Sequence, residues 1–196
     1  VVSYQTFFNN PATADLWGIE AEARVSFGFF EDIDAIADWS PDWLEYLSIG
    51  GNYTYIKAEV PRTATDIAAT QTFYAVAEGE TALFQSLPPT RRLFNQPEWI
   101  ANADISFDHP DSGLRATLAY FAISDVLDAA GSATVNPETG LTFAYVPDRY
   151  VGAYMDLRAT LSKTFVLPGS FGEMTLSATA KNLTNSSRKL IYDSTQ

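Results

Sequence analysis

Cysteine is absent from this 196-residue chain, histidine occurs once, and basic residues are half as numerous as acidic ones, 12 against 24, which gives a formal net charge of −12. Without cysteine the chain can form neither disulfides nor thiolate metal sites. Its negative charge argues against nucleic acid as a partner, because a polyanion would be repelled. A catalytic arrangement with histidine would have to rest on His109 alone, and no nearby residue suggests one. We therefore expect no enzyme activity, no catalytic residue, no metal and no cofactor.

A long apolar run is also lacking. No stretch reaches the ~18 consecutive apolar residues that a transmembrane helix needs, although 46% of the residues are hydrophobic. A transmembrane β-barrel remains compatible with this composition, because its apolar residues alternate with polar ones and leave the mean hydropathy near zero. Aromatic residues make up 14% of the chain, which is too many for a disordered acidic tail.

Strict alternation of apolar and polar residues is the strongest pattern that is present. In LWGIEAEARVSFGF (Leu16–Phe29), every second residue from Trp17 onward is apolar, and the residues between them are small, polar or charged. Such alternation indicates a β-strand whose two faces meet different surroundings. No segment of comparable strength has helical periodicity, so we predict a nearly all-β chain. The other predicted strands are Val1–Phe8, Leu47–Tyr55, Trp99–Asp108, Leu114–Ile123, Val151–Ser162 and Glu173–Lys181.

The predicted connections alternate in length along most of the chain. HPDSG (His109–Gly113) and LPGSF (Leu167–Phe171) are tight turns built on proline and glycine. Glu59–Glu98 and Asp125–Tyr150 are excursions of roughly 25 to 40 residues, far longer than ordinary hairpin loops. Short turns at one end of a sheet and long loops at the other are typical of an outer-membrane barrel. Strands of about 11 to 15 residues, with aromatic residues near their ends, fit the same architecture.

Two alternatives stay open at this point. A soluble β-sandwich binding module would also show alternation, because one face of each of its sheets is buried. The many alanines of the apolar face nevertheless suit a lipid-facing surface better than a densely packed core. A passive outer-membrane porin would share the barrel but would be a complete chain of modest size without a plug.

Six segments, taken in order, carry a family resemblance. They are GIEAEARVSF (18–27), LSIGGNYTYIKAEV (47–60), RRLFNQPEWIANADISFD (91–108), SGLRATLAYF (112–121), YMDLRATLSKTF (154–165) and LSATAKNLTN (176–185). Together they resemble the barrel of TonB-dependent outer-membrane receptors. The resemblance implies that residues 1–196 form the C-terminal part of a plugged barrel of about 22 strands. Because AKNLTN is similar to the penultimate strand of the family, we expect about seven strands here, with the final strand and the N-terminal plug absent.

The resemblance also implies a function and a set of partners. A receptor of this kind lies in the bacterial outer membrane, in contact with its lipid, and takes up a scarce nutrient. Candidate ligands are small molecules such as iron–siderophore complexes and cobalamin, or glycans. Energy would come from the TonB complex, through the N-terminal region.

Two groups of candidate site residues follow from these expectations. The long connection Glu59–Glu98 is the best place for ligand recognition, because binding residues often lie on loops. Within it we favour Phe73 and Tyr74 over Arg91 and Arg92, since RRLFNQP leads straight into a strand. A second group alternates with the apolar residues, and we expect it to line the barrel lumen: Glu20, Glu22, Arg24, Asp104, Arg115, Asp156, Arg158 and Lys181.

The acidic segment EDIDAIADWSPD (Glu31–Asp42) raises the question of calcium. It has neither the glycine at position six nor the glutamate at position twelve of an EF-hand loop. We therefore expect a solvated periplasmic connection.

Overall fold

The computed structural model describes residues 12–33, 41–64, 67, 88–135, 138–139, 142–169 and 171–193. The elements with described bounds are β-strands and two short 3-10 helices, η1 (Phe27–Asp32) and η2 (Asp42–Tyr46). The all-β prediction is confirmed. Among the described residues, no helix has the length and the hydropathy needed to cross a membrane. The predicted strand Val1–Phe8 lies outside the described residues.

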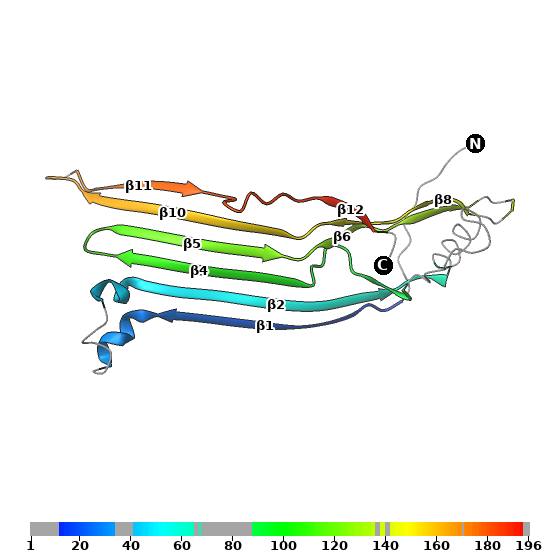
Figure 1. Ribbon diagram of the computed structural model, residues 1–196, viewed down its shortest axis with the longest axis horizontal. Helices are drawn as coiled ribbons and strands as arrows, with labels where there is room; N and C mark the ends of the chain where they lie inside the picture. The colour runs from blue at the N-terminus through cyan, green and yellow to red at the C-terminus, as the bar shows by residue number, and fades with distance from the viewer. Residues whose placement is uncertain are drawn as a thin grey trace.

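Six long strands form the main sheet of the described chain, in the order β1-β2-β4-β5-β10-β11, and the short strand β3 pairs with the end of β2 (Figure 1). Every neighbouring pair is antiparallel. The six long strands overlap the six alternating segments that fall on described residues, which confirms that these strands exist. Two bounds were predicted wrongly: Phe27–Phe29 belong to η1 rather than to the first strand, and β10 begins at Tyr154 rather than at Val151. The bounds are β1 Asp15–Ser26, β2 Leu47–Pro61, β3 Thr90–Arg92, β4 Trp99–His109, β5 Leu114–Ile123, β10 Tyr154–Val166 and β11 Glu173–Ala180.

The two ends of the sheet differ, as the connection lengths predict. Short turns join β4 to β5 and β10 to β11 at the end where η1 and η2 also lie, and the long connections leave from the opposite end (Figure 1). In the first short turn, Gly113 adopts a φ of 65° and its carbonyl accepts a 2.8 Å hydrogen bond from the Thr164 N–H. A Cβ at Gly113 would come within 2.6 Å of the Thr164 oxygen, so this close approach requires glycine.

The second long connection contains strands that the sequence did not predict. They are β6 (Val126–Ala129), β7 (Ser132–Val135), β8 (Thr142–Val146) and β9 (Asp148–Val151). Each has four or five residues, too few for alternation to identify it. The pairing of Val126 with Val151 keeps the register that pairs Ile123 with Tyr154, so the β5–β10 hairpin continues beyond the main sheet. β12 (Leu190–Asp193) then pairs with β9.

The register places alternating residues of neighbouring strands on two continuous faces. On the apolar face, lateral rows of paired residues run across the strands, such as Ile19–Tyr55–Trp99. Large side chains of this face are exposed, among them Ile19 at 65% and Leu161 at 54%. A soluble sandwich would bury such a face against a second sheet, and the described residues provide no such layer. Within the described part, the buried hydrophobic residues are Ala58, Ala122, Leu127 and Tyr150.

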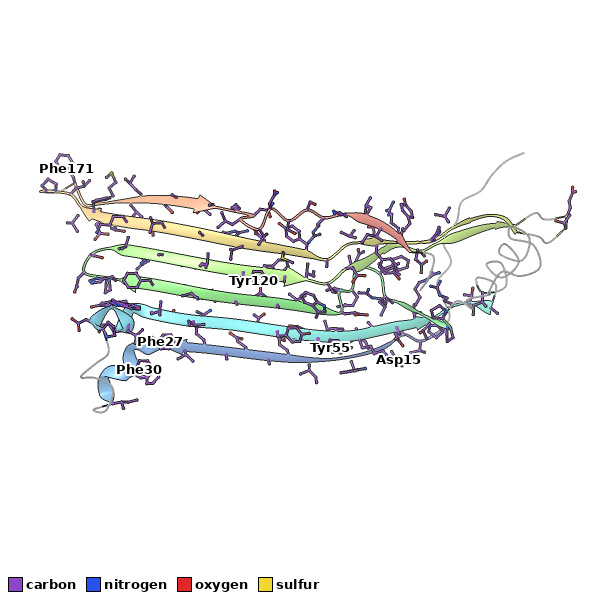
Figure 2. The ribbon with its side chains drawn as sticks, in the orientation of Figure 1. Asp15, Phe27, Phe30, Tyr55, Tyr120 and Phe171 are labelled. Carbon is purple, nitrogen blue, oxygen red and sulfur yellow. The ribbon has the colours of Figure 1, made fainter. Side chains whose placement is uncertain are left out.

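The height of the apolar face matches that of a membrane-spanning band. Between Leu47 and Lys57, β2 rises about 34 Å at ~3.4 Å per residue. A strand tilt of about 40° reduces this to about 26 Å, close to the ~25 Å apolar band of outer-membrane barrels. Aromatic residues mark the limits: Trp17 packs against Tyr55 with ring centroids 5.6 Å apart, and Phe27 lies at the short-turn end (Figure 2).

An arginine near the middle of this apolar band should lower the stability of the protein in a membrane. Ala103 pairs with Gly51, close to mid-height and on the apolar face. In a bilayer, Ala103→Arg should lower the free energy of unfolding of the full-length protein by about 2–4 kcal/mol. Ala119→Arg on the polar face, opposite Asp104, should change it by less than about 1 kcal/mol. Denaturant titration in phospholipid vesicles compares the two variants, and equal costs would contradict the assignment of the faces.

Candidate functional site

The polar face of the sheet carries the charged residues predicted from alternation. Glu20, Glu22 and Arg24 share this face of β1, and the register aligns Arg24 with Gly50 and Gly50 with Asp104. The Arg24 guanidinium therefore reaches across β2 and donates two hydrogen bonds to the Asp104 carboxylate, at 2.8 and 3.2 Å. A Cβ at Gly50 would lie 2.6 Å from this guanidinium, so glycine leaves the passage open.

Two further ion pairs lie on the same face. Arg115 meets Asp108 at 2.9 Å, and Arg158 meets Asp156 at 3.1 Å. Both arginines are exposed, whereas the Asp156 side chain is only 12% exposed. The Arg115–Asp108 pair is exposed on both sides, and such pairs contribute only about 0–1 kcal/mol. The register thus brings together every predicted lumen-facing residue except Lys181, which follows directly after the last residue of β11.

Charged side chains are buried at the end of the sheet from which the long connections leave. The side chain of Asp148, in β9, is only 4% exposed and meets arginines from both ends of the long 59–98 connection. Arg62, 3% exposed, donates from Nη2 at 2.8 Å, and Nε of Arg91 lies 3.3 Å from the same carboxylate oxygen. The Gly131 N–H donates to the other oxygen. Asp148 therefore ties β2 and β3 to the extension formed by β6 and β9.

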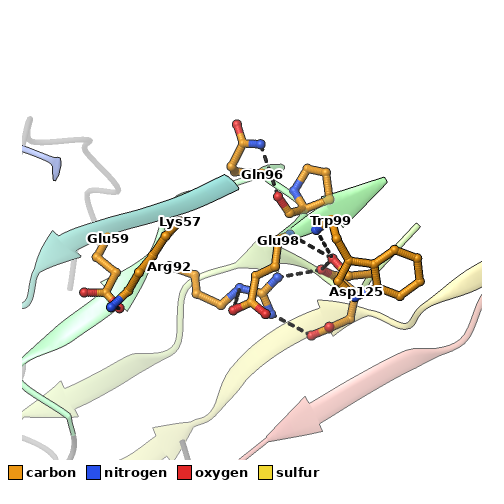
Figure 3. Close-up of polar contacts among 9 residues, drawn as sticks. Lys57, Glu59, Arg92, Gln96, Glu98, Trp99 and Asp125 are labelled. Atoms are coloured by element: carbon orange, nitrogen blue, oxygen red, sulfur yellow. Dashed lines mark hydrogen bonds and ion pairs between the residues drawn. The ribbon is translucent and has the colours of Figure 1, made fainter. Parts of the chain in front are cut away.

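Arg92 forms a second junction, and Figure 3 shows its contacts with Asp125. Its Nη1 donates to the Asp125 carboxylate at 2.8 Å and its Nη2 to the Asp125 carbonyl at 2.7 Å, while Nε lies 3.5 Å from Glu98. The hydroxyl oxygen of Ser124 accepts the Glu98 N–H at 2.8 Å. The guanidinium carbon also lies 5.7 Å from the centre of the Tyr150 ring, within the range of a cation–π contact. The start of β4 is thereby fixed to the end of β5.

These contacts give Arg91 and Arg92 a structural role at the end of the long connection. Arg91 pairs with Asp148 of β9, and Arg92 pairs with Asp125, which lies between β5 and β6. The recess that they line beside Tyr150 has a volume of about 160 Å³, which is below the ~300 Å³ of ordinary small-molecule pockets. The favoured ligand contacts, Phe73 and Tyr74, lie outside the described residues.

The buried junction was not predicted from the sequence. Arg62 and Asp148 are 86 residues apart, and Asp148 falls in a segment predicted to be a loop. Only a weak indication of this contact is present in the sequence. Basic residues stand near both ends of the Glu59–Glu98 connection, and carboxylates lie near both ends of the Asp125–Tyr150 connection. No sequence spacing links these two observations.

Another ion pair strengthens the β6–β9 extension. Nε of Arg149 donates a 2.7 Å hydrogen bond to the Asp128 carboxylate. This bond, followed by the contact with Tyr192, raises the pKa of the Arg149 guanidinium above its usual value. In the part of the chain that the structure describes, no group of His, Cys, Asp or Glu side chains is arranged to hold a metal ion. Residues 34–40 of the acidic segment considered for calcium lie outside that part.

An antiparallel sheet with a membrane-high apolar face, short turns at one end and long connections at the other defines a transmembrane β-barrel protein. The model of the family described as "TonB dependent receptor-like, beta-barrel" matches residues 1–183, so the chain belongs to this family. The family comprises outer-membrane transporters of Gram-negative bacteria rather than enzymes. Comparison with curated proteins and with solved structures gave no match.

Removing the Asp148 carboxylate, which holds Arg62 and Arg91 together, should strongly destabilise the fold. Asp148→Asn should destabilise the full-length protein by about 3–5 kcal/mol, because the buried Arg62 and the largely buried Arg91 would lose their counter-charge. Asp108→Asn removes a carboxylate that pairs with an exposed arginine and should cost at most about 1 kcal/mol. Chemical unfolding followed by tryptophan fluorescence measures both variants. Similar small costs would show that the junction contributes little to stability.

Proposed function

We propose that this protein takes up a scarce nutrient through a plugged outer-membrane barrel, with energy supplied by the TonB complex. The observation that carries the proposal is the family match over residues 1–183. Iron–siderophore complexes, cobalamin and glycans are the candidate ligand classes. The protein would lie in the outer membrane, with the short turns in the periplasm and the long connections outside.

Residues 1–196 would form the C-terminal part of this barrel. In hydrocarbon, every backbone N–H and C=O needs a partner within the protein. In the described sheet, β1 and β11 each pair on one side only. Further strands would pair with both edges and close a barrel of about 22 strands. The plug and the segment that contacts TonB would precede this part of the chain.

The polar face would line the lumen. Its exposed charges, from Glu20 and Glu22 on β1 to Arg158 on β10, would hydrogen-bond to water or to the plug. The predicted Lys181 would join them beyond the end of β11. A lining of mixed charge supports a plugged barrel, because both signs offer partners to a folded polar domain.

Ligand recognition would belong to the long connection between β2 and β4. Arg62 and Arg91 hold its two ends against Asp148, which provides a rigid base for a binding loop. Phe73 and Tyr74 lie between these ends, and their rings could stack on a ligand.

Uptake assays on the full-length protein test the proposal. Cells carrying the protein should accumulate one of the three ligand classes, and deletion of TonB should abolish this uptake. The protein itself should require detergent for extraction and should have several times the 21.5 kDa mass of this chain. Uptake that persists without TonB would indicate a passive porin, and a detergent-independent protein of about this mass would contradict the barrel function altogether.

The two aromatic residues can be tested once a ligand is found. Phe73→Ala and Tyr74→Ala should each weaken binding about three- to tenfold, the usual range for loss of one aromatic contact. Tyr74→Phe keeps the ring and serves as the matched control. Equilibrium binding to purified full-length protein measures the change, and unchanged affinity in both alanine variants would exclude these contacts.

A further inference from the structure

A groove of about 570 Å³ crosses the apolar face toward the short-turn end. Two lateral rows of the apolar face line it, together with Thr117, Thr160 and Thr179 of the row between them. One row is Phe107–Ala116–Leu161–Ala178, and the next row, nearer mid-height, is Ile105–Leu118–Ala159–Ala180. Large side chains alternate with alanines in the first row, and two alanines stand side by side in the second. The alanines form the floor and the larger residues form the walls, so the face is furrowed rather than flat.

Polar groups bound the groove on its short-turn side. The next lateral row is His109–Leu114–Lys163–Leu176, so Lys163 stands on the apolar face one row beyond Leu161. Its ammonium donates to the Ser112 carbonyl and lies 5.9 Å from the centre of the Phe165 ring. Neither contact neutralises the charge, and an ammonium has three hydrogens to donate.

His109 adds a second donor to the same row. Its Nδ1 accepts a 3.2 Å hydrogen bond from the Ser112 N–H, which assigns the proton to Nε2. The ring stacks on Tyr46 with centroids 4.2 Å apart. The structure corrects one expectation here, because His109 is the last residue of β4, paired with Leu114, rather than part of the turn.

We propose that this groove binds a phospholipid with an anionic headgroup in the periplasmic leaflet. The phosphate would meet Lys163, with His109 at the far edge of the headgroup, and one acyl chain would lie in the alanine-floored groove. Charge complementarity supports this occupant, since the basic group stands at the water-facing end of an apolar furrow. Continuity supports it as well, because the groove is part of the face that meets lipid. Asp111 and Glu173 line a separate recess around the turn that Lys163 also borders, and both are exposed.

The proposal rests on the barrel lying in the membrane but not on which nutrient it carries. It makes lipid selectivity depend on two separable features, the charge of Lys163 and the open floor at Ala159. The lipid face supplies matched controls for both features. Lys57 has the apolar-face register at the opposite end of β2, where its register partner is Trp17 and its ammonium pairs with Glu59 at 3.2 Å. Ala101 lies on the same face outside the groove.

Native mass spectrometry of the full-length, delipidated protein tests the site, with dioleoyl-phosphatidylglycerol and dioleoyl-phosphatidylcholine as probes. The unmodified protein should retain phosphatidylglycerol preferentially. Lys163→Gln should lower its retention about fivefold, the effect of one basic group at an anionic lipid surface, and should leave phosphatidylcholine unchanged. Ala159→Leu should fill the groove and lower retention of both lipids.

The controls Lys57→Gln and Ala101→Leu should behave like the unmodified protein. Equal retention of the two lipids by the unmodified protein, or an equal effect of Lys163→Gln and Lys57→Gln, would overturn the headgroup site. Equal retention by the Ala159→Leu and Ala101→Leu variants would overturn the acyl groove. TonB-dependent uptake in a protein without lipid preference would overturn this inference alone and leave the transport function intact.

Discussion

Backbone pairing between antiparallel strands is the constraint on which the rest of this structure depends. In hydrocarbon no water is present to satisfy a backbone N–H or C=O, so neighbouring strands must supply every partner. Pairing fixes the register, and register decides which residues face which side. A slip of one residue between β1 and β2 would move Arg24 and the glutamates of β1 to the apolar face. The alternation along each strand and the pairing between strands therefore specify one arrangement together.

Where the backbone pairing between strands is interrupted, hydrogen bonds from polar side chains hold the segments together. β2 pairs with β3 and with β4 in registers that differ by three residues, as Glu59–Arg92 and Tyr55–Trp99 show. The segment between β3 and β4 is secured by Ser124, which accepts the Glu98 N–H, and by the Arg92–Asp125 contacts. The break between β11 and β12 is handled in the same way. There Asn182 and Asn185 have positive φ, and the Asn182 N–H donates to the Asp156 carboxylate at 2.7 Å.

Most of the main sheet could be predicted from short-range sequence patterns. The junction at Asp148 could not, because its residues are far apart in the sequence. Alternation and proline–glycine turns are read within a few residues, so the long strands and both short turns could be predicted. The four-residue strands β6 and β9 carry too few residues for a period, and they form because the β5–β10 hairpin continues. The partners of Asp148 come from the far ends of another connection, 86 residues away for Arg62. These charges come together only when the strands have paired in three dimensions.

The ion pairs of the polar face and the buried pair at the base of the long connection differ in their contribution to stability, and this difference suits the proposed transport. Arg24–Asp104 and Arg115–Asp108 have exposed arginines, and ion pairs of this kind contribute little to stability. Water, a plug or a passing ligand can exchange with them at little cost. The Arg62–Asp148 pair is buried on both sides, and breaking such a pair leaves an uncompensated charge that costs several times more. The base of the long connection can thus stay fixed while the polar wall below it changes partners.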